Sequence, residues 1–337
     1  MSAAEAEPTV LARRRGRTGH ILLNRPRALN ALDTEMVLAV SAALDPWRDD
    51  PAVHAVVIEG AGGRAFCAGG DIRAVRAASL AGQHDAIATF FTAEYALNQA
   101  IADYPKPYIA LVDGICMGGG IGVSVHGWAR VVTEAAMFAM PETGIALFPD
   151  IGATYILPRL RGQIGLYMAL TGARLLGADA AFAGLATHYT SHDTIAGLAQ
   201  ALAEHGPAAL AGVDIAFDAP IAAHMDAIDR CFGADSVAAI LQRLEAEGTA
   251  WSRETLAAIR AASPSAVLWT FEIVRAGAGR TLPQCLAAEL ALTRHATVHP
   301  DFIEGVRAMV IDKDRQPKWS AARIEDVDPA DIAHLFA

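Results

Sequence analysis

Two carboxylic acids, Glu142 and Asp150, lie close together in an otherwise apolar stretch, Met137-Phe-Ala-Met-Pro-Glu-Thr-Gly-Ile-Ala-Leu-Phe-Pro-Asp150. Removing a carboxyl group from water raises its pKa toward the range that is useful for proton transfer. The pair is therefore a candidate acid–base couple. Two structural interpretations compete with catalysis: Glu142 as a solvated turn residue, and Asp150 as the cap of a helix beginning at Ile151. The local pattern leaves all three open.

Two glycine-rich turns add a second kind of chemistry. They are Phe66-Cys-Ala-Gly-Gly-Asp71 and Met117-Gly-Gly-Gly-Ile-Gly122, and each comes before the start of a predicted helix. Glycine lets a ligand oxygen approach the backbone, and a helix start leaves N–H groups unpaired. Two converging N–H groups make an oxyanion hole, in which losing one donor costs about 3 to 4 kcal/mol of transition-state stabilisation. The structural alternatives are a tight turn with Asp71 as a helix cap, and close packing at Gly118, Gly120 and Gly122.

Other chemistries are weaker interpretations of the same residues. The GxGxxG spacing of a dinucleotide-binding turn is missing at both glycine turns. The sequence contains no GxSxG elbow for a serine nucleophile. We therefore expect His126 to be a hydrogen-bonded core residue and Cys67 to be a small buried residue beside its turn.

The elements that must position these residues follow from periodicity. Apolar residues at three- and four-residue steps from Met36 to Trp47 predict a helix that Asp33 caps. A long helix is predicted over 83–104, with Glu94 among its residues. Strand, glycine turn and helix occur twice, and the chain is expected to be mostly helical after residue 150. The predicted strands are 11–15, 20–24, 53–59, 108–113, 129–133 and 137–140; residues 114–120 are predicted to form a turn, followed by a helix over 121–127.

Length and composition indicate the domain organisation and the fold class. A chain of 337 residues exceeds the usual single-domain size, so we expect a core over 1–225 and a mainly helical region over 226–337. The sequence is 53% hydrophobic but only 7% aromatic, which suits helices packed on parallel strands and hence an α/β fold.

The net charge and the cysteine residues indicate which binding partners and which cellular compartment to expect. The net charge of −10 argues against nucleic acid and anionic membranes as partners. The first twenty residues lack the apolar core of a secretory signal, and no stretch of about 18 apolar residues follows. We therefore expect a soluble, cytoplasmic protein without a metal site. The four cysteines are far apart and form no CxxC, which indicates reduced thiols: Cys67, Cys116, Cys231 and Cys285.

Four segments together resemble the crotonase, or enoyl-CoA hydratase/isomerase, superfamily in order and spacing. They are Leu23-Asn-Arg-Pro-Arg-Ala-Leu-Asn-Ala-Leu32, Phe66–Asp71, Asp113-Gly-Ile-Cys-Met-Gly-Gly-Gly120 and Pro141-Glu142. The resemblance implies an α/β spiral of repeated ββα units with a C-terminal helical region. It also implies an acyl-CoA substrate, no cofactor beyond the CoA of that substrate, and a homo-oligomer of the trimer-based kind.

The resemblance also implies roles for individual residues. The N–H groups of Gly70 and Gly119 would bind the thioester oxygen, and Glu142 would face the acyl group. The superfamily lines its CoA path at the positions of Ala68, Gly69, Asp71 and Ile72. Arg25, Arg27 and Arg73 are candidate partners of the CoA phosphates.

At one position the sequence differs from the enoyl-CoA hydratases of the superfamily, and this difference argues against hydration as the reaction. Enoyl-CoA hydratases carry a second catalytic glutamate just after the triple glycine, where this chain has Gly122. Further segments resemble instead the branch of the superfamily that hydrolyses 3-hydroxyisobutyryl-CoA, and they extend the resemblance over nearly the whole chain. These segments are Phe-Thr-Ala-Glu94-Tyr, Ser124-Val-His-Gly127, Phe148-Pro-Asp150, His299-Pro-Asp-Phe-Ile-Glu-Gly-Val-Arg307 and Ile311-Asp-Lys-Asp-Arg-Gln-Pro-Lys-Trp319.

The expected activity is hydrolysis of a short 3-hydroxyacyl-CoA, most simply 3-hydroxyisobutyryl-CoA, as in valine breakdown. Glu142 would attack the carbonyl or activate water. Asp150 would orient Glu142 or the water, with the substrate hydroxyl as a further candidate partner. Glu94 would line the acyl pocket. The alternatives are an enoyl-CoA hydratase or isomerase with Glu142 as its base, and an acyl-CoA-binding subunit without catalysis.

Overall fold

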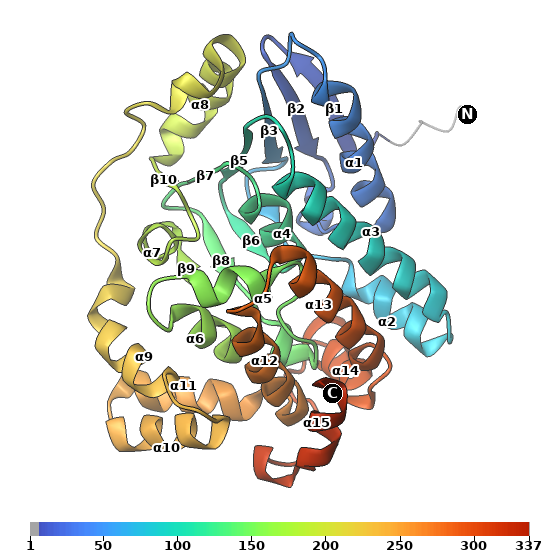
Figure 1. The fold of residues 1–337 in the computed structure, drawn as a ribbon, viewed down its shortest axis with the longest axis vertical. Helices are drawn as coiled ribbons and strands as arrows, with labels where there is room; N and C mark the ends of the chain where they lie inside the picture. Colours follow the sequence, from blue (N-terminus) through green and yellow to red (C-terminus); the bar gives the residue numbers. More distant parts are fainter. Residues whose placement is uncertain (1–6, 337) are drawn as a thin grey trace.

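The computed structural model of the chain describes residues 7–336. The expectation of no secretory signal rests in part on residues 1–6, which lie outside the described residues. Two β-sheets occupy the upper and middle parts of the molecule in Figure 1, with helices on both sides and the C-terminal helices below them. The larger sheet has the strand order β1-β2-β3-β5-β7-β10 and the smaller one β4-β6-β8-β9.

Most neighbouring strands run parallel; the pairs β1–β2 and β8–β9 are antiparallel. The strands of the larger sheet are β1 Val10–Arg15, β2 Thr18–Leu23, β3 Ala55–Gly60, β5 Tyr108–Val112, β7 Ala129–Val132 and β10 His188–Tyr189. Those of the smaller sheet are β4 Ala65–Cys67, β6 Ile115–Met117, β8 Met137–Ala139 and β9 Leu175–Leu176.

The chain winds through the two sheets as a spiral. Strands β3, β5 and β7 enter the larger sheet in turn, and each is followed by a strand of the smaller sheet, β4, β6 or β8. A helical segment comes after each pair. The predicted α/β fold of repeated ββα units is therefore confirmed. Because β4, β6 and β8 are parallel neighbours, their carboxyl ends meet, and the segments that follow them share one place in the molecule.

The helices cover the sheets and fill the C-terminal region. They are α1 Thr34–Arg48, α2 Ile72–Leu80, α3 His84–Ala102, α4 Gly119–Val125, α5 Ala153–Ile156, α6 Ile164–Thr171, α7 Gly177–Ala183, α8 His192–His205, α9 Met225–Phe232, α10 Val237–Glu247, α11 Ala250–Ala261, α12 Pro264–Gly277, α13 Leu282–Ala296, α14 Pro300–Val306 and α15 Pro329–Phe336. Among residues 7–336, no helix is both long and apolar enough to span a bilayer.

Local sequence explains where several helices begin. The carboxylate of Asp33 accepts the N–H of Met36, so α1 is capped as predicted, and Met36, Val40, Leu44 and Trp47 are buried.

The prediction of a plain turn over 114–120 was wrong: residues 115–117 form β6, and α4 begins at Gly119. The strand is too short for its alternation to stand out among the glycines.

The C-terminal helices pack directly on the spiral. Helix α12 contacts α5 and α6, α13 contacts α3 and α5, and α14 contacts α2. In Figure 1 these orange and red helices lie beside α2 and α5. One hydrophobic cluster includes residues of both parts, among them Leu147, Phe148, Phe271 and Phe302. The division at residue 225 stays a prediction, but the later residues take part in building the site.

Candidate active site

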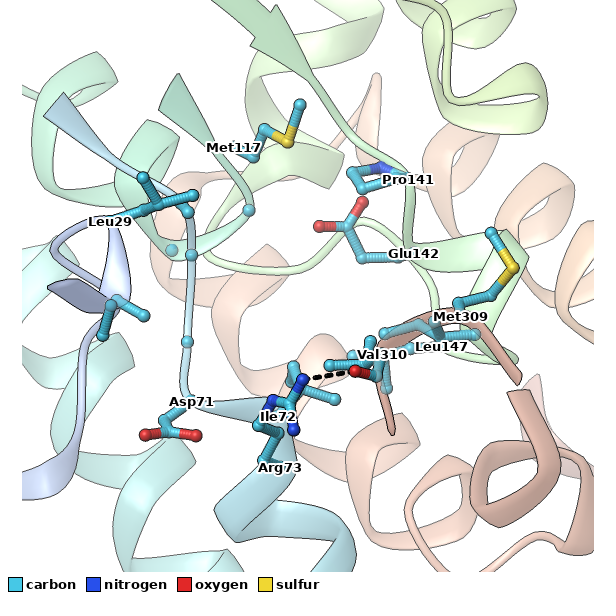
Figure 2. A pocket seen from close by; sticks show the side chains of 18 of the residues that line it. Leu29, Asp71, Ile72, Arg73, Met117, Pro141, Glu142, Leu147, Met309 and Val310 are labelled. Atoms are coloured by element: carbon cyan, nitrogen blue, oxygen red, sulfur yellow. Dashed lines mark hydrogen bonds between the residues drawn. The ribbon is translucent and has the colours of Figure 1, made fainter. Parts of the chain in front are cut away.

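A cavity of about 690 Å³ lies beside the two glycine turns. Its other side is formed by the segment after β8 and by Met309, Val310 and Lys313 of the C-terminal region. Figure 2 shows the Glu142 side chain in this cavity, with Asp71 and Leu29 across from it. All the predicted catalytic and substrate-binding residues line the same space: Glu142, Asp150, Gly70, Gly119, Glu94, Ala68, Gly69, Asp71 and Ile72.

Two backbone donors face this cavity. Gly70 follows β4 and Gly119 follows β6, and the parallel pairing of these strands brings the two turns together. A methyl group on Gly119 would lie 3.2 Å from the nitrogen of Gly70. Within the described part of the chain, the hydrogen bonds assign no acceptor to either N–H. Two neighbouring, unpaired donors at a cavity wall can stabilise a developing oxyanion.

The turns need glycine for reasons of space as well as backbone conformation. Gly69 has φ 105° and Gly118 has φ 44°, in the region that favours glycine. A side chain on Gly119 would overlap Oε1 of Glu94, and one on Gly118 would lie 2.9 Å from Oε1 of Glu142. The glycines thus let two carboxyl groups approach the backbone donors.

Glu142 begins the 3-10 helix Glu142–Ile145, directly after β8. Its side chain is buried, and its Oε2 has no hydrogen-bond partner among the described residues. The alternative of a solvated turn residue is therefore wrong. Burial raises the pKa of Glu142 well above its usual range, and the neighbouring charge of Asp150 raises it further. A buried carboxyl group without a protein partner at a cavity wall is available to a ligand.

Asp150 is buried beside α3. Its Oδ2 accepts a 2.6 Å hydrogen bond from the hydroxyl of Tyr95. Burial raises the pKa of Asp150 to about 6, and the Tyr95 hydrogen bond acts in the opposite direction. Asp150 does not cap a helix at Ile151, because α5 begins at Ala153 and its N-terminal flanking residue is Gly152. The helix-cap interpretation was therefore wrong.

Glu94 lies on α3 and points toward the second glycine turn. The residue is 2% exposed, and its Oε1 has no hydrogen-bond partner within residues 7–336. Burial raises the pKa of Glu94 well above its usual range, and the charges of Asp150 and then Glu142 add to the effect. The charge of Asp150 thus disfavours ionisation of Glu94 and of Glu142.

Position 122 has no room for a side chain. A methyl group on Gly122 would lie 2.8 Å from Nδ2 of Asn98 and 2.9 Å from Cβ of Ile151. The close-packing interpretation is correct here and also at Gly120, where a side chain would overlap the carbonyl of Cys67. A glutamate at residue 122 therefore has no place in this packing.

His126 and Cys67 take structural positions, as expected. Nε2 of His126 lies 2.7 Å from the carbonyl oxygen of Ile151, so this nitrogen carries the proton. Burial lowers the pKa of His126 to about 4, which keeps the ring neutral at neutral pH. Cys67 is fully buried, and burial raises the pKa of its thiol to about 12, so it is no thiolate nucleophile.

The cations at the cavity differ in how far they are already paired. Arg25 lies 2.9 Å from Asp33 and 3.3 Å from Asp71, and Asp71 also caps α2 through the N–H of Ala74. Arg73 donates to the carbonyl of Val310, as Figure 2 shows. No ion pair within the described residues involves Arg27 or Lys313. Their roles toward CoA phosphates stay predictions.

Sequence reasoning missed two sets of residues. Tyr95 and Asp150 are 55 residues apart in the sequence, and the packing of α3 against the segment after β8 joins them. Met309, Val310 and Lys313 reach the cavity because α14 packs on α2. The available signals were the resemblance of Phe-Thr-Ala-Glu94-Tyr and of the segments after residue 299, and a resemblance carries no geometry. No cluster of possible metal ligands was found within residues 7–336.

Comparison with known proteins defines the class first. The family model described as enoyl-CoA hydratase/isomerase matches residues 18–336, and the chain therefore belongs to that family. Within it, the chain is 44% identical to 3-hydroxyisobutyryl-CoA hydrolase, mitochondrial, of Rattus norvegicus, over 100% of this chain and 90% of the relative. It is 42% identical to the Homo sapiens protein of the same name, over 98% and 89% of the two chains.

Solved structures share the fold closely. A carnitinyl-CoA dehydratase from Mycobacterium thermoresistibile is 40% identical, with a TM-score of 0.94 over 98% of this chain and 97% of the other. An enoyl-CoA hydratase from Rhodobacter sphaeroides 2.4.1 is 42% identical, with a TM-score of 0.92 over the same shares. The similar proteins are named after different reactions: hydrolysis, dehydration and hydration. The geometry of the active site must therefore decide among these reactions for this chain.

Proposed function

We propose that this protein hydrolyses 3-hydroxyisobutyryl-CoA to 3-hydroxyisobutyrate and CoA. The observation that carries the proposal is the placement of carboxyl groups around the unpaired N–H groups of Gly70 and Gly119. Glu142 and Asp150 are both present, whereas Asn98 and Ile151 close the space beside Gly122. The names of the full-length relatives support the same activity.

In this mechanism the thioester oxygen binds between the two N–H groups. They polarise the carbonyl and stabilise the oxyanion that forms when a nucleophile adds. The C–S bond then breaks, and CoA leaves as a thiol that takes up a proton. A water oxygen ends in the new carboxylate. Each N–H is expected to contribute about 3 to 4 kcal/mol to the transition state.

Glu142 is the proposed nucleophile or general base. Attack by its carboxylate would form an anhydride that water then opens, and general-base catalysis would deliver water directly. Burial and the neighbouring charge of Asp150 raise the pKa of Glu142 well above its usual range, which disfavours a second negative charge beside ionised Asp150. We propose that Asp150 accepts the Glu142 proton before the addition step and later returns a proton to the leaving thiol.

Glu94 is the proposed contact for the substrate hydroxyl. A carboxyl group kept neutral by burial can both donate and accept a hydrogen bond. The closeness of its Oε1 to Gly119 supports a position next to a carbonyl bound at that N–H. This contact would favour 3-hydroxyacyl groups over unsubstituted ones.

Several expectations from the sequence extend the proposal. We propose that catalysis needs no cofactor beyond the CoA of the substrate, and that nucleic acids and membranes are not partners. Ala68, Gly69, Asp71 and Ile72 would line the CoA path. A cytoplasmic location, a role in valine catabolism and a trimer-based homo-oligomer stay part of the proposal; the relatives' names place those proteins in mitochondria.

Hydration of an enoyl-CoA is the second candidate. It is favoured by the name of the Rhodobacter sphaeroides structure, which shares 42% identity and nearly the whole fold. Glu142 would act as the base in that reaction. The closed space beside Gly122 argues against it, because the second glutamate of hydratases has no position there.

A substrate panel separates the candidates. Purified protein is mixed with 3-hydroxyisobutyryl-CoA, 3-hydroxypropionyl-CoA or crotonyl-CoA, and thiol release and enoyl absorbance are followed together. We expect rapid thiol release from the 3-hydroxyacyl thioesters and little loss of crotonyl absorbance. Fast crotonyl-CoA hydration without thiol release would overturn the hydrolase proposal. Tight binding of every thioester without turnover would favour a non-catalytic subunit.

A further inference from the structure

Glu289 is a fully buried carboxyl group to which the proposed chemistry assigns no role. It lies on α13 and is 0% exposed. Helix α13 packs against both α3, which carries Glu94 and Tyr95, and α5, which follows Asp150. The helix that carries this buried carboxyl group thus contacts the two elements that hold the candidate site together.

The three hydrogen bonds that Glu289 accepts from the described residues all come from the segment after Asp150. Oε2 accepts the N–H of Gly152 at 2.7 Å, and Oε1 accepts the N–H of Thr154 at 3.0 Å and its hydroxyl at 2.5 Å. Burial raises the pKa of Glu289 to about 8, while the hydrogen bonds from Thr154 and Gly152 favour its charged form. The contacts tie α13 to the backbone two residues after Asp150.

The segment that Glu289 holds has an unusual backbone. Ile151 has φ 60° and Gly152 has φ 76°. The left-handed region is unfavourable for a β-branched residue and persists only where surrounding contacts impose it. His126 fixes the carbonyl of Ile151, and Glu289 fixes the next N–H. Together they set the direction in which the chain leaves Asp150.

We propose that Glu289 is a positioning residue for Asp150. It anchors the strained Ile151–Gly152 turn, so that the Asp150 carboxylate meets the Tyr95 hydroxyl and faces Glu142. The inference rests on the proposed thioester hydrolysis, in which Asp150 handles protons. It assigns to the C-terminal helices a direct part in aligning the reacting groups, because misplacement of a reacting group by about 1 Å can cost a factor on the order of 100 in rate.

The test uses Glu289→Gln in the full chain with 3-hydroxyisobutyryl-CoA. The amide keeps the size of the side chain and one acceptor oxygen, but its NH₂ group cannot accept the N–H of Gly152. We expect kcat to fall roughly 10- to 100-fold, while KM changes less than about twofold because Glu289 does not line the cavity. Thr154→Val removes only the hydroxyl donor. It should also lower kcat with little change of KM, but by a smaller factor.

A double-mutant cycle separates positioning from general damage. In an Asp150→Asn background, Glu289→Gln should lower kcat no further, since the group that it positions has already been disabled. Asp179→Asn is the matched control: Asp179 is another buried carboxylate, which accepts the N–H of Ile221 away from the cavity. That variant is expected to lose thermal stability without a comparable loss of kcat.

Two results would overturn the positioning role. One is a Glu289→Gln protein with the kcat of the unaltered chain. The other is an equal fold-loss in the presence and absence of Asp150→Asn. If Glu289→Gln does not fold, the double-mutant cycle with Asp150→Asn is carried out with Thr154→Val instead. Failure of the hydrolase proposal itself would look different, because the unaltered chain would then release no CoA from 3-hydroxyisobutyryl-CoA.

Discussion

Tyr95 donates a 2.6 Å hydrogen bond to Oδ2 of Asp150 and thereby joins helix α3 to the segment after β8. Both groups are buried, so the bond acts in a medium where water does not compete for the carboxylate. Burial raises the pKa of Asp150 to about 6, and the Tyr95 hydrogen bond acts against this rise. The charge of the carboxyl cluster therefore depends on a residue outside the proposed chemical steps.

Replacing Tyr95 by Phe is expected to raise the pKa of Asp150, because the hydrogen bond that favours the charged form is lost. An aspartate is ionised above its pKa, so activity that needs ionised Asp150 falls as the pH drops through about 6. In Tyr95→Phe this fall should begin at a higher pH, by roughly one to two units, since a hydrogen bond to a charged group contributes about 1.5 to 3 kcal/mol.

The measurement is kcat/KM for 3-hydroxyisobutyryl-CoA between pH 5 and about 8.5, a range that includes the pKa values of such perturbed carboxyl groups. Tyr104→Phe is the control, because Tyr104 donates to the carbonyl of Leu44 and does not line the cavity. The same acid limb in Tyr95→Phe and in the unaltered chain would contradict the assignment.

The carboxyl pair itself gives the second prediction. Glu142→Gln and Asp150→Asn should each lower kcat by a factor on the order of 100 to 10,000, the usual contribution of general acid–base catalysis. Both changes preserve side-chain size, so thermal unfolding should change little. Removing a charge that burial disfavours can even raise the unfolding temperature. Turnover at the unaltered rate in either variant would remove that residue from the mechanism.

The resemblance of the motifs implied the spiral, and the glycine turns and carboxyl groups of the cavity could be predicted from the sequence for identifiable reasons. Glycine turns after apolar strands leave a mark in the sequence because only glycine tolerates the conformation at Gly69 and Gly118. The sequence of helix α1 contains both its capping residue, Asp33, and apolar residues at helical spacing. The carboxylates Glu142 and Asp150 are conspicuous because they interrupt a buried, apolar stretch.

Contacts between distant segments were not accessible in the same way. Tyr95 looks like one more buried aromatic residue of α3, and Glu289 looks like one more charge on an amphipathic helix. Their partners, Asp150 and Gly152, are set by how α3 and α13 pack against the segment after β8. No local pattern encodes such packing, because it depends on the whole arrangement of the layers.

Glu94 gives a prediction about specificity. Glu94→Ala should lower kcat/KM for 3-hydroxyisobutyryl-CoA roughly 10- to 100-fold, the cost of losing a buried hydrogen bond to the substrate hydroxyl. For isobutyryl-CoA, which lacks that hydroxyl, the loss should be clearly smaller. Glu94→Gln keeps a donor and an acceptor, so it should lie between the two. Thiol release from both substrates gives the ratio, and equal losses for both would rule out the contact.

Position 122 gives the last prediction. Gly122→Ala places a methyl group 2.8 Å from Nδ2 of Asn98 and 2.9 Å from Cβ of Ile151. Overpacking of this kind costs about 1 to 3 kcal/mol of the free energy of unfolding. Since Ile151 adjoins Asp150, the displacement should also lower kcat. The control is Gly197→Ala on the exposed face of α8, where a methyl group meets no atom within 4 Å and alanine favours the helix by up to about 1 kcal/mol.

Chemical denaturation and thiol release on the same preparations would measure both effects. A further variant, Gly122→Glu, restores the residue that hydratases carry, yet the packing leaves it no path to the cavity. It should be less stable still and should gain no crotonyl-CoA hydration. If it hydrates crotonyl-CoA at an appreciable rate, then Asn98 and Ile151 do not close this position, and the structural reason for preferring hydrolysis is lost.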